Sequence, residues 1–330
     1  MQLLLDTNGL TVRKKNDCFW ITSKAGRRLI SPNRITSIAV TGDCLFSSAA
    51  IRLAAWYKIP IFFFNAAAKV DAQLWSDSFG SIATIRREQV LLALTPEATV
   101  WMAGLFQLKS AHQIQNLQWL KRKYPSRAKI WEEGMKTIGG KAEEFSQWND
   151  QLLRDCQQNM MGLEGTLARV YWALVAEAMP EEWKFAGRSR RPAKDRFNAA
   201  LNYLYGMLYS VVGGATLAAG LDTHLGFLHA DEYNKPAFTF DLIEPFRPWV
   251  DGLLVEAILD GKLKPEYFEE KEGGIFVSKE GRRVIIPMFN DFMEEKKTFN
   301  HRHLSHKNQI YRFAGEFGQF LLKRAGEGNK

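Results

Sequence analysis

A group of polar residues stands within a mostly apolar stretch, residues 226–248, whose sequence is GFLHADEYNKPAFTFDLIEPFRP. Its polar side chains include an imidazole, several carboxylates and a guanidinium: His229, Asp231, Glu232, Asp241, Glu244 and Arg247. Carboxylates and imidazole are side chains that bind divalent cations such as Mg²⁺ and Mn²⁺. Because unpaired charges are costly in apolar surroundings, we expect these groups to converge on a partner.

Single residues of this stretch also allow structural interpretations. Asp241, Glu244 and Arg247 recur every three residues and would share one face of a helix. Asp241 could then cap the helix N-terminus with Glu244 at the N3 position, as in a capping box. His229 could be a core histidine whose hydrogen bonds are satisfied.

A further carboxylate, Glu164, opens an apolar helical pattern, EGTLARVYWALVAEAM. A carboxylate beside the buried face of this helix needs a partner, since an unpaired buried charge is costly. The alternative is an acid at a helix N-terminus that faces the helix dipole or a nearby arginine. With His229 and Glu244 it would complete a metal site of two carboxylates and one imidazole, although only folding could join residues so distant in sequence.

A basic segment, KFAGRSRRPAKDR at residues 184–196, lies between Glu164 and His229. Its glycine, serine and proline favour a loop. Its basic residues are Lys184, Arg188, Arg190, Arg191, Lys194 and Arg196. The chain carries a formal net charge of +8 and has a pI of about 9.3, which favours a polyanionic partner such as nucleic acid. The segment is therefore either a solvated loop or a strip that contacts DNA phosphates.

The chain divides into a strand-rich region and a helix-rich region, which would position these residues. We therefore predict an α+β fold. Residues 1–83 contain short apolar runs bounded by Asn, Gly, Pro or Asp, which predict a small β-rich domain. One helix inside it would be capped by Ser47 or Ser48. Residues 84–330 show mainly helical spacing, apart from a predicted β-hairpin at residues 274–287.

Several classes of protein are disfavoured by the sequence. The three cysteines, which have neither metal-site spacing nor the number for a disulfide framework, favour a reducing cytoplasm; they are Cys18, Cys44 and Cys156. The first residues lack the basic segment of a signal peptide. The uncharged residues 197–221 are long enough to span a membrane, but their polar residues and glycines favour one buried helix, or two that break at Gly213–Gly214. The histidine-rich segment 301–306 lacks a cysteine pair and is expected to be a polar surface turn.

Four segments occur in a characteristic order between residues 164 and 251: EGTLARVYWAL, DRFNAALNYLYGMLYS, GLDTHLGFLH and FTFDLIEPFRPWVD. Together they resemble the CRISPR-associated integrase family, the "Cas one" family, whose members insert new spacers into CRISPR arrays. The β-rich start resembles the N-terminal domain of that family, so the resemblance covers nearly the whole chain. It implies an N-terminal β domain and a C-terminal α domain, in agreement with the patterns above.

The resemblance implies roles for named residues. The metal ligands of the family correspond to Glu164, His229 and Glu244, with Asp241 as a neighbouring catalytic acid. Thr223 stands where the family often has proline, and Glu244 where some members have aspartate, but neither difference removes a ligand. Arg247 would contact DNA, and it would either orient an acid or stabilise the charged transition state; both roles stay open.

The resemblance also implies a reaction and partners. The reaction would be phosphoryl transfer with Mg²⁺ or Mn²⁺, in which the 3′-hydroxyl of a short double-stranded protospacer attacks the CRISPR repeat beside its leader. The partners would be DNA, a second copy of the chain bound through residues 1–83, and a small second CRISPR-associated adaptation protein, with no membrane involved. Two alternatives stay open: a metal-dependent structure-specific DNase that uses water, and a DNA-binding scaffold whose acids are only structural.

Overall fold

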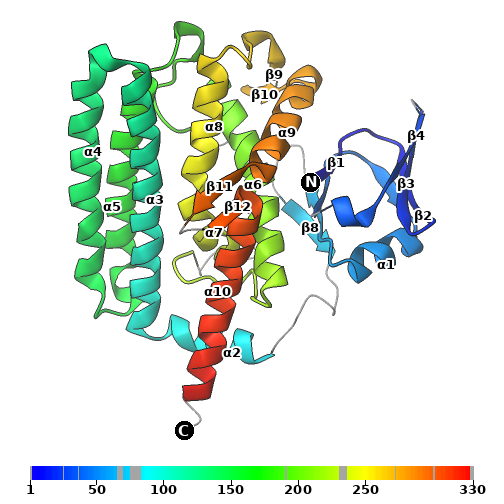
Figure 1. Ribbon diagram of the computed structural model, residues 1–330, viewed down its shortest axis with the longest axis horizontal. Helices are drawn as coiled ribbons and strands as arrows, with labels where there is room; N and C mark the ends of the chain where they lie inside the picture. Colours follow the sequence, from blue (N-terminus) through cyan, green and yellow to red (C-terminus); the bar gives the residue numbers. More distant parts are fainter. Residues whose placement is uncertain are drawn as a thin grey trace. The chain divides into compact units, whose positions relative to one another are not determined.

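The computed structural model describes residues 2–24, 26–35, 37–64, 70–74, 83–189, 192–229, 236–271, 273–299 and 302–327. The predicted α+β fold is confirmed, because strands dominate the N-terminal region and helices dominate the rest (Figure 1). Contacts divide the chain into two compact units. The first comprises Met1–Glu88, Tyr209–Asp222 and Asn290–Lys330, and the second comprises Gln89–Leu208 and Thr223–Phe289. Both units take in distant segments, so the sequence boundary expected after residue 83 stays a prediction.

The N-terminal part of the first unit contains two four-stranded sheets. One has the order β1-β5-β7-β8, in which only β8 is antiparallel to its neighbour. The other has the order β4-β3-β2-β6, in which only β6 pairs in parallel. The strands are β1 (Gln2–Leu5), β2 (Leu10–Lys15), β3 (Cys18–Ser23), β4 (Gly26–Ile30), β5 (Ser37–Val40), β6 (Cys44–Phe46), β7 (Ile61–Phe64) and β8 (Val70–Leu74).

Alternation along these strands builds one apolar core. Successive side chains of a strand point to opposite faces, so Val12 on β2 and Phe19 on β3 are buried together with Ile38 and Ile61. Helix α1 (Ser48–Trp56) follows β6. The Ser47 hydroxyl accepts a hydrogen bond from the Ala50 amide at 3.2 Å, which confirms the predicted cap.

The C-terminal part of the first unit contains a hairpin of β11 (Lys296–Phe299) and β12 (Arg302–Ser305), followed by α10 (His306–Glu327). His306 is buried, stacks on Phe292 with ring centroids 4.1 Å apart, and contacts the Phe292 carbonyl through Nδ1 at 2.8 Å. The expected polar surface turn is therefore wrong for the described part of segment 301–306, because strand pairing and aromatic stacking order it. His301 lies outside the described residues.

Most of the apolar segment 197–221 lies in one helix, α6 (Arg196–Ala218), which has no break at Gly213–Gly214. A Cβ at Gly214 would lie 2.8 Å from the Tyr311 hydroxyl, so the glycine permits a close approach rather than a bend. Among the described residues, no single helix is long and apolar enough to cross a membrane. Helices α2 (Ala83–Ala93) and α3 (Pro96–Lys123), which meet at 91°, would pass that test only as a pair.

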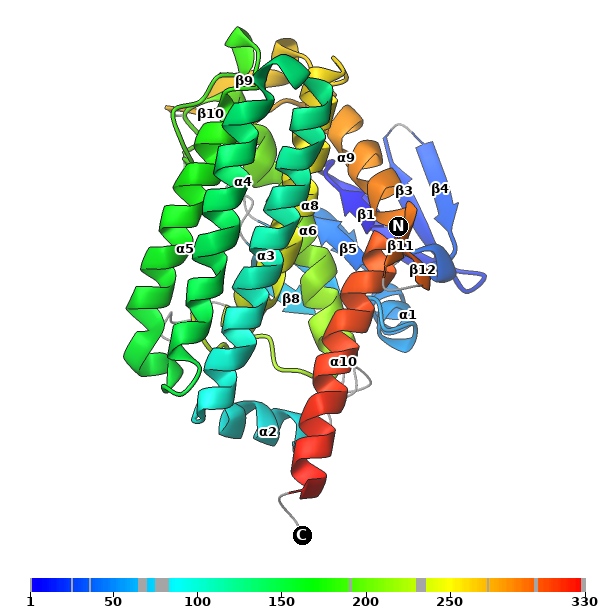
Figure 2. The ribbon, with the colours of Figure 1, turned by 60° about the vertical axis from the view of Figure 1, so that its left-hand side comes forward.

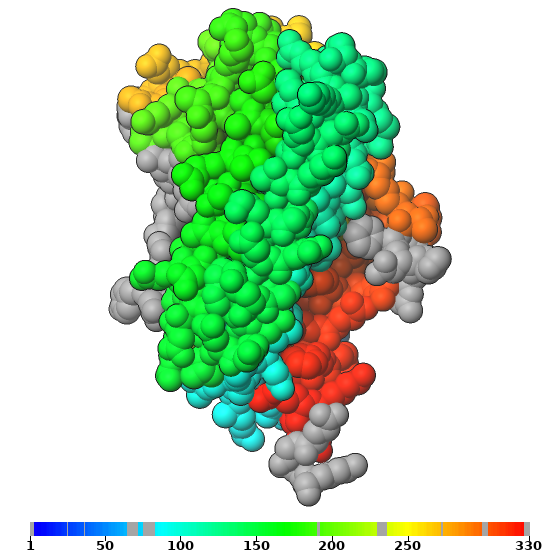
Figure 3. All heavy atoms as spheres, turned by 90° about the vertical axis from the view of Figure 1, so that its left-hand side faces the viewer, coloured from blue at the N-terminus to red at the C-terminus, as the bar shows by residue number. Residues whose placement is uncertain are grey.

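Long helices dominate the second unit. Helices α3, α4 (Ala128–Glu143) and α5 (Leu153–Ala176) run side by side (Figure 2). Trp131 on α4 is fully buried and donates a hydrogen bond to the Leu174 carbonyl of α5 at 3.2 Å. Much of the face seen in Figure 3 is formed by the green residues of α4 and α5. Further elements that lie wholly or partly in this unit include α7 (Ala237–Ile243), the 3₁₀ turn η5 (Glu244–Phe246), α8 (Arg247–Leu259), β9 (Phe268–Lys271), β10 (Gly274–Val277) and α9 (Lys279–Glu294).

The β-hairpin predicted at residues 274–287 is wrong. Strand β10 pairs with β9, which precedes it, and the chain then enters α9. The β-branched run within RRVIIP suggested a strand, but Gly281, Ile285 and Phe289 are buried at every fourth position, which is the helical period. Burial of this helix face therefore outweighs the preference of the β-branched residues for a strand.

Helix α4 offers a matched test of helix packing. A Cβ at Gly134 would lie 2.2 Å from Leu174 Cδ1, whereas nothing lies within 4 Å of a Cβ at Gly140 on the same helix. Gly134→Ala should lower the free energy of unfolding by about 1–3 kcal/mol through overpacking. Gly140→Ala should raise it by about 0.5–1 kcal/mol through helix propensity. Urea unfolding of both variants checks this, and equal effects would contradict the described α4–α5 packing.

Candidate active site

A row of polar side chains on α3 organises the second unit around the predicted site residues. Lys109, His112 and Asn116 are three and four residues apart and therefore share one face of the helix. Lys109 and His112 are buried, and Asn116 is half-buried. Each of them binds the segment that begins at Glu244.

The Lys109 ammonium joins two of the predicted site residues. Its Nζ donates to Glu164 Oε1 at 2.5 Å and to Glu244 Oε2 at 2.7 Å. The Lys109 side chain is 11% exposed and that of Glu244 is 8% exposed. Burial acts to lower the pKa of Lys109, but the charges of Glu244 and Glu164 outweigh it and hold the pKa above its ordinary value. The lysine is therefore a permanent cation between two acids.

Glu164 lies in the middle of α5, so its interpretation as an acid at a helix N-terminus is wrong. The apolar pattern began at Glu164, but the helix starts eleven residues earlier, at Leu153, in a more polar sequence. The partner of this carboxylate is Lys109 on another helix. An ion pair with a neighbouring helix, rather than the helix dipole, therefore stabilises the Glu164 carboxylate.

Glu244 is held by a second cation. Arg247 donates from Nε to Glu244 Oε1 at 2.8 Å, while Lys109 binds the other oxygen. Burial acts to raise the pKa of Glu244, but the charges of Arg247 and Lys109 lower it to about 2. The Arg247 guanidinium also lies 4.7 Å from the centre of the Tyr205 ring. In this structure Arg247 orients an acid, which is one of the two roles left open by the sequence.

The backbone after Glu244 is fixed by the other two residues of the row. His112 Nδ1 lies 2.6 Å from the Pro245 carbonyl oxygen, and Asn116 Nδ2 donates to the Pro248 carbonyl at 2.7 Å. Burial lowers the pKa of His112, so the neutral ring can donate from Nδ1 to this carbonyl. The α3 row therefore holds both the side chain and the backbone of this segment.

Asp241 on α7 holds the loop that carries His229. Its Oδ2 accepts hydrogen bonds from the amides of Phe227 and Leu228 at 2.6 and 3.2 Å, and its Oδ1 lies 2.7 Å from His229 Nδ1. The capping-box prediction is wrong, because Asp241 lies inside α7 and caps this loop instead. A carboxylate at Nδ1 fixes the imidazole, so Nε2 is the nitrogen that could bind a cation.

The same loop depends on a close approach at Gly226. A Cβ there would lie 2.5 Å from the Ala237 Cβ and 3.0 Å from the Phe238 backbone nitrogen. Only glycine therefore lets the loop lie against the first turn of α7. Gln157 of α5 further secures the loop by donating to the Leu228 carbonyl.

A further buried carboxylate, Asp251 on α8, forms a polar pair with Tyr205. The Tyr205 hydroxyl donates to Asp251 Oδ1 at 2.6 Å. Burial raises the pKa of Asp251 to about 7, although the hydrogen bond and the nearby Arg188, Lys109 and Arg247 act to lower it. Burial and the charge of Asp251 also raise the pKa of Tyr205 well above its ordinary value.

The basic segment is only partly described. Arg190 and Arg191 lie outside the described residues. Arg188 is half-buried and donates to the side-chain oxygens of Asn198 and Asn202, the latter at 2.9 Å. Lys194 and Arg196 are exposed. Contact with DNA phosphates stays a prediction for these residues and for Arg247, and the exposed pair is best placed to test it.

The donor types fit a divalent cation, but Lys109 now contacts both carboxylates. In the ranges that the structure describes, no group of three or more His, Cys, Asp or Glu side chains is arranged to hold a metal ion. Glu164 and Glu244 nevertheless meet at one nitrogen, that of Lys109. Two carboxylates and one imidazole match the preferences of Mg²⁺ or Mn²⁺. Asp231 and Glu232 lie outside the described residues.

Sequence reasoning missed the α3 row and the Tyr205–Asp251 pair. A signal for the row was present, because polar residues recur at 109, 112 and 116 on a helix whose intervening residues include a buried Ser110 and Gln113. A helix face that contacts only an apolar core would carry fewer polar residues than this one. The regular helical spacing of these polar residues indicates that they share one face. The sequence contained no comparable signal for the partners of this face, since they lie more than 50 residues away.

The Asp251 pKa predicts a pH-dependent stability difference. Folded Asp251 keeps its proton up to about pH 7, whereas the unfolded side chain loses it near pH 3.8, so this group lowers stability as pH rises between these values. Asn cannot titrate. The free energy of unfolding of Asp251→Asn relative to the unmodified protein should therefore increase by up to about 1.4 kcal/mol per pH unit from pH 4 to 7. Urea unfolding at each pH measures this, and a difference that is constant with pH would contradict it.

Comparison with known proteins assigns the family. The family model for "CRISPR associated protein Cas1" matches residues 3–291. A protein of Archaeoglobus fulgidus named "CRISPR-associated endonuclease Cas1 1" is 28% identical, over 97% of this chain and 96% of its own length.

Solved structures share the fold. A casposase bound to integration product has a TM-score of 0.81 at 24% identity and covers 98% of this chain and 91% of its own. A chain of a Cas6-RT-Cas1–Cas2 complex has a TM-score of 0.80 at 20% identity and covers 98% of this chain and 35% of its own. Because the family model spans most of the sequence, the chain belongs to the Cas1 family of CRISPR-associated proteins.

Proposed function

We propose that this protein is a divalent-metal-dependent DNA integrase and endonuclease that inserts short DNA duplexes into a CRISPR array. The observation that carries the proposal is the convergence of Glu164 and Glu244 on Lys109 within the same unit as the Asp241–His229 pair. The name of the Archaeoglobus fulgidus relative, an endonuclease, supports phosphodiester chemistry.

The proposed reaction is a transesterification. The 3′-hydroxyl of the inserted duplex loses its proton as its oxygen forms a bond to a phosphorus of the repeat. The bond from that phosphorus to the leaving 3′-oxygen breaks, and the leaving oxygen takes up a proton. A bound Mg²⁺ or Mn²⁺ would polarise the phosphoryl oxygen and lower the pKa of the attacking hydroxyl. Water in place of the DNA hydroxyl would give hydrolysis by the same ligands.

The residues of the chain would divide the work between binding and orientation. Glu164, Glu244 and the Nε2 atom of His229 would hold the cation. Asp241 fixes the imidazole, and Arg247 fixes one oxygen of Glu244. Such outer contacts tune metal ligands and typically affect activity by about 10–100-fold when removed. Lys194 and Arg196 would contribute to non-specific DNA binding through phosphate contacts.

Substitutions should separate chemistry from DNA binding. His229→Ala removes a proposed metal ligand, so strand transfer should fall at least about 100-fold. Duplex affinity should stay within a few-fold of that of the unmodified protein. The double variant Lys194→Ala/Arg196→Ala should instead weaken binding to all sequences and flatten the slope of log affinity against log salt by about 1.8. A labelled duplex and a repeat-containing plasmid, with the partner protein and Mg²⁺ or Mn²⁺, measure transfer.

The control is His303→Ala, which removes an exposed histidine from β12 and should leave transfer unchanged. Normal integration by His229→Ala would contradict the assigned metal site. An unchanged salt slope in the double variant would show that Lys194 and Arg196 do not contact DNA phosphates. The products also distinguish the alternatives. Shortened strands without joined ones favour a DNase, and no cation-dependent product favours a scaffold.

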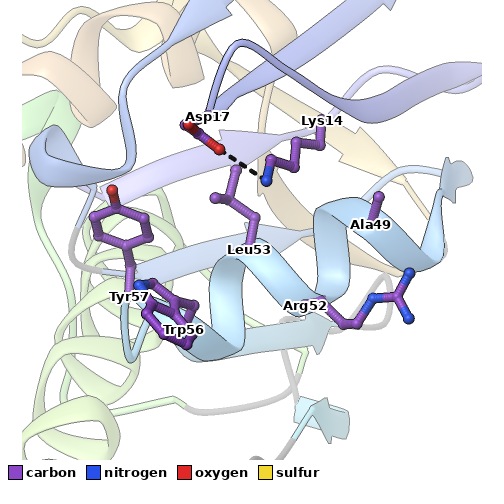
Figure 4. A pocket seen from close by; sticks show the side chains of 7 residues that line it. All are labelled: Lys14, Asp17, Ala49, Arg52, Leu53, Trp56 and Tyr57. Carbon is purple, nitrogen blue, oxygen red and sulfur yellow. Dashed lines mark ion pairs between the residues drawn. The ribbon is translucent and has the colours of Figure 1, made fainter.

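We further propose that the protein forms a homodimer through its N-terminal β-rich domain and binds the small second CRISPR-associated adaptation protein. Exposed apolar side chains on this domain support dimerisation, namely Leu29, Leu45, Trp56 and Tyr57. The Trp56 side chain, 82% exposed, lines a hollow with Arg52 near the Lys14–Asp17 ion pair (Figure 4). Burial of such surface contributes about 25 cal/mol per Å².

Trp56→Glu should therefore shift the dimer towards monomer, because a carboxylate would have to be buried where an indole was. Sedimentation equilibrium over a range of concentrations measures the dissociation constant. Met161→Glu, at a 45% exposed position on α5, is the matched control and should leave the constant unchanged. A dimer of undiminished affinity in Trp56→Glu would exclude this surface.

A further inference from the structure

Lys109 occupies the place where the two proposed carboxylate ligands meet. Its single nitrogen lies 2.5 Å from Glu164 Oε1 and 2.7 Å from Glu244 Oε2. Both contacts are short and charge-assisted, so they belong to the strong class of hydrogen bonds. The lysine reaches both acids from α3, which supplies neither of them.

The charges of this cluster balance without any added cation. Glu164 and Glu244 carry two negative charges, and Lys109 and Arg247 carry two positive ones. The partly buried Glu164 and the buried Glu244 would repel each other without a cation, and burial of an unpaired charge is strongly destabilising. Lys109 therefore keeps the acids close in the absence of metal.

The same contacts oppose metal binding. A divalent cation binds carboxylate oxygens at about 2.0–2.6 Å. At that distance it would occupy the space of the Lys109 ammonium, which could then no longer form hydrogen bonds to both oxygens. The two cations would also repel each other, and this repulsion is stronger in a partly buried site than in water.

We propose that Lys109 is a positioning residue that holds Glu164 and Glu244 together before a divalent cation binds, and that yields these contacts when the cation binds. This inference rests on the proposed metal-dependent function. Lys109 thereby stabilises the metal-free protein and weakens its affinity for the cation. The alternative is a permanent structural ion pair that remains when metal is bound.

The test is direct Mn²⁺ binding by the full-length protein, with free Mn²⁺ followed by electron paramagnetic resonance. Lys109→Met keeps an unbranched side chain only one atom shorter than lysine and removes its charge. It should bind Mn²⁺ at least about ten-fold more tightly than the unmodified protein, because a buried competing charge is gone. Its melting temperature should be lower without Mn²⁺ and should rise more on Mn²⁺ addition. Lys123→Met is the matched control on α3, where the lysine pairs with Asp260 at 2.8 Å near the surface, and its affinity should not change.

Two further variants keep the test decisive. Lys109→Arg retains the charge and should keep the weaker affinity of the unmodified protein. Lys109→Gln serves if Lys109→Met does not fold, and it should also bind Mn²⁺ more tightly. The unmodified protein could bind Mn²⁺ while the uncharged variants bind it equally or more weakly. That result would overturn the role of Lys109 but not the proposed metal site. Absence of Mn²⁺ binding in the unmodified protein and every variant would overturn both this inference and the proposed metal site.

Discussion

An ammonium held between two carboxylates is the contact on which the second unit depends. Lys109 joins α3 to α5 through Glu164 and to the start of η5 through Glu244. Desolvation of three charges is unfavourable, and only their mutual attraction together with the Arg247 contact offsets it. Two of the proposed metal ligands, Glu164 and Glu244, therefore also hold helices together. A change to either should alter stability as well as chemistry.

Two acids seven residues apart illustrate how environment sets function. Glu244 has two cations on its oxygens, and its pKa falls to about 2. Asp251 has a tyrosine hydroxyl as its hydrogen-bond partner, and burial raises its pKa to about 7. Both side chains are almost fully buried. The nature of the partner, rather than burial itself, therefore makes one an anion at every physiological pH and lets the other hold a proton.

The order of β-rich and helical regions was predictable, because short apolar runs and helical periodicity are local properties. The Ser47 cap followed from the same local chemistry. Helix α9 was not predictable from its β-branched run, because its buried face is defined by neighbours distant in sequence. The ligand candidates Glu164, His229 and Glu244 could be named from residue type and motif order. Lys109 could not be assigned to them, and Asp241 appeared as a helix cap because its partners in the 227–229 loop exist only after folding.

The long sequence separations within the site have a consequence for synthesis of the chain. Lys109 is 135 residues from Glu244, and His112 is 133 residues from Pro245. Contacts of this kind form late, after the neighbouring helices α3 to α5 have had the opportunity to assemble locally. A ribosome-bound chain that ends before η5 thus has the scaffold but lacks Glu244, the second carboxylate of the proposed metal site. Any reaction that needs this site could begin only after the chain beyond Glu244 has emerged, so shorter incomplete copies would lack the proposed activity.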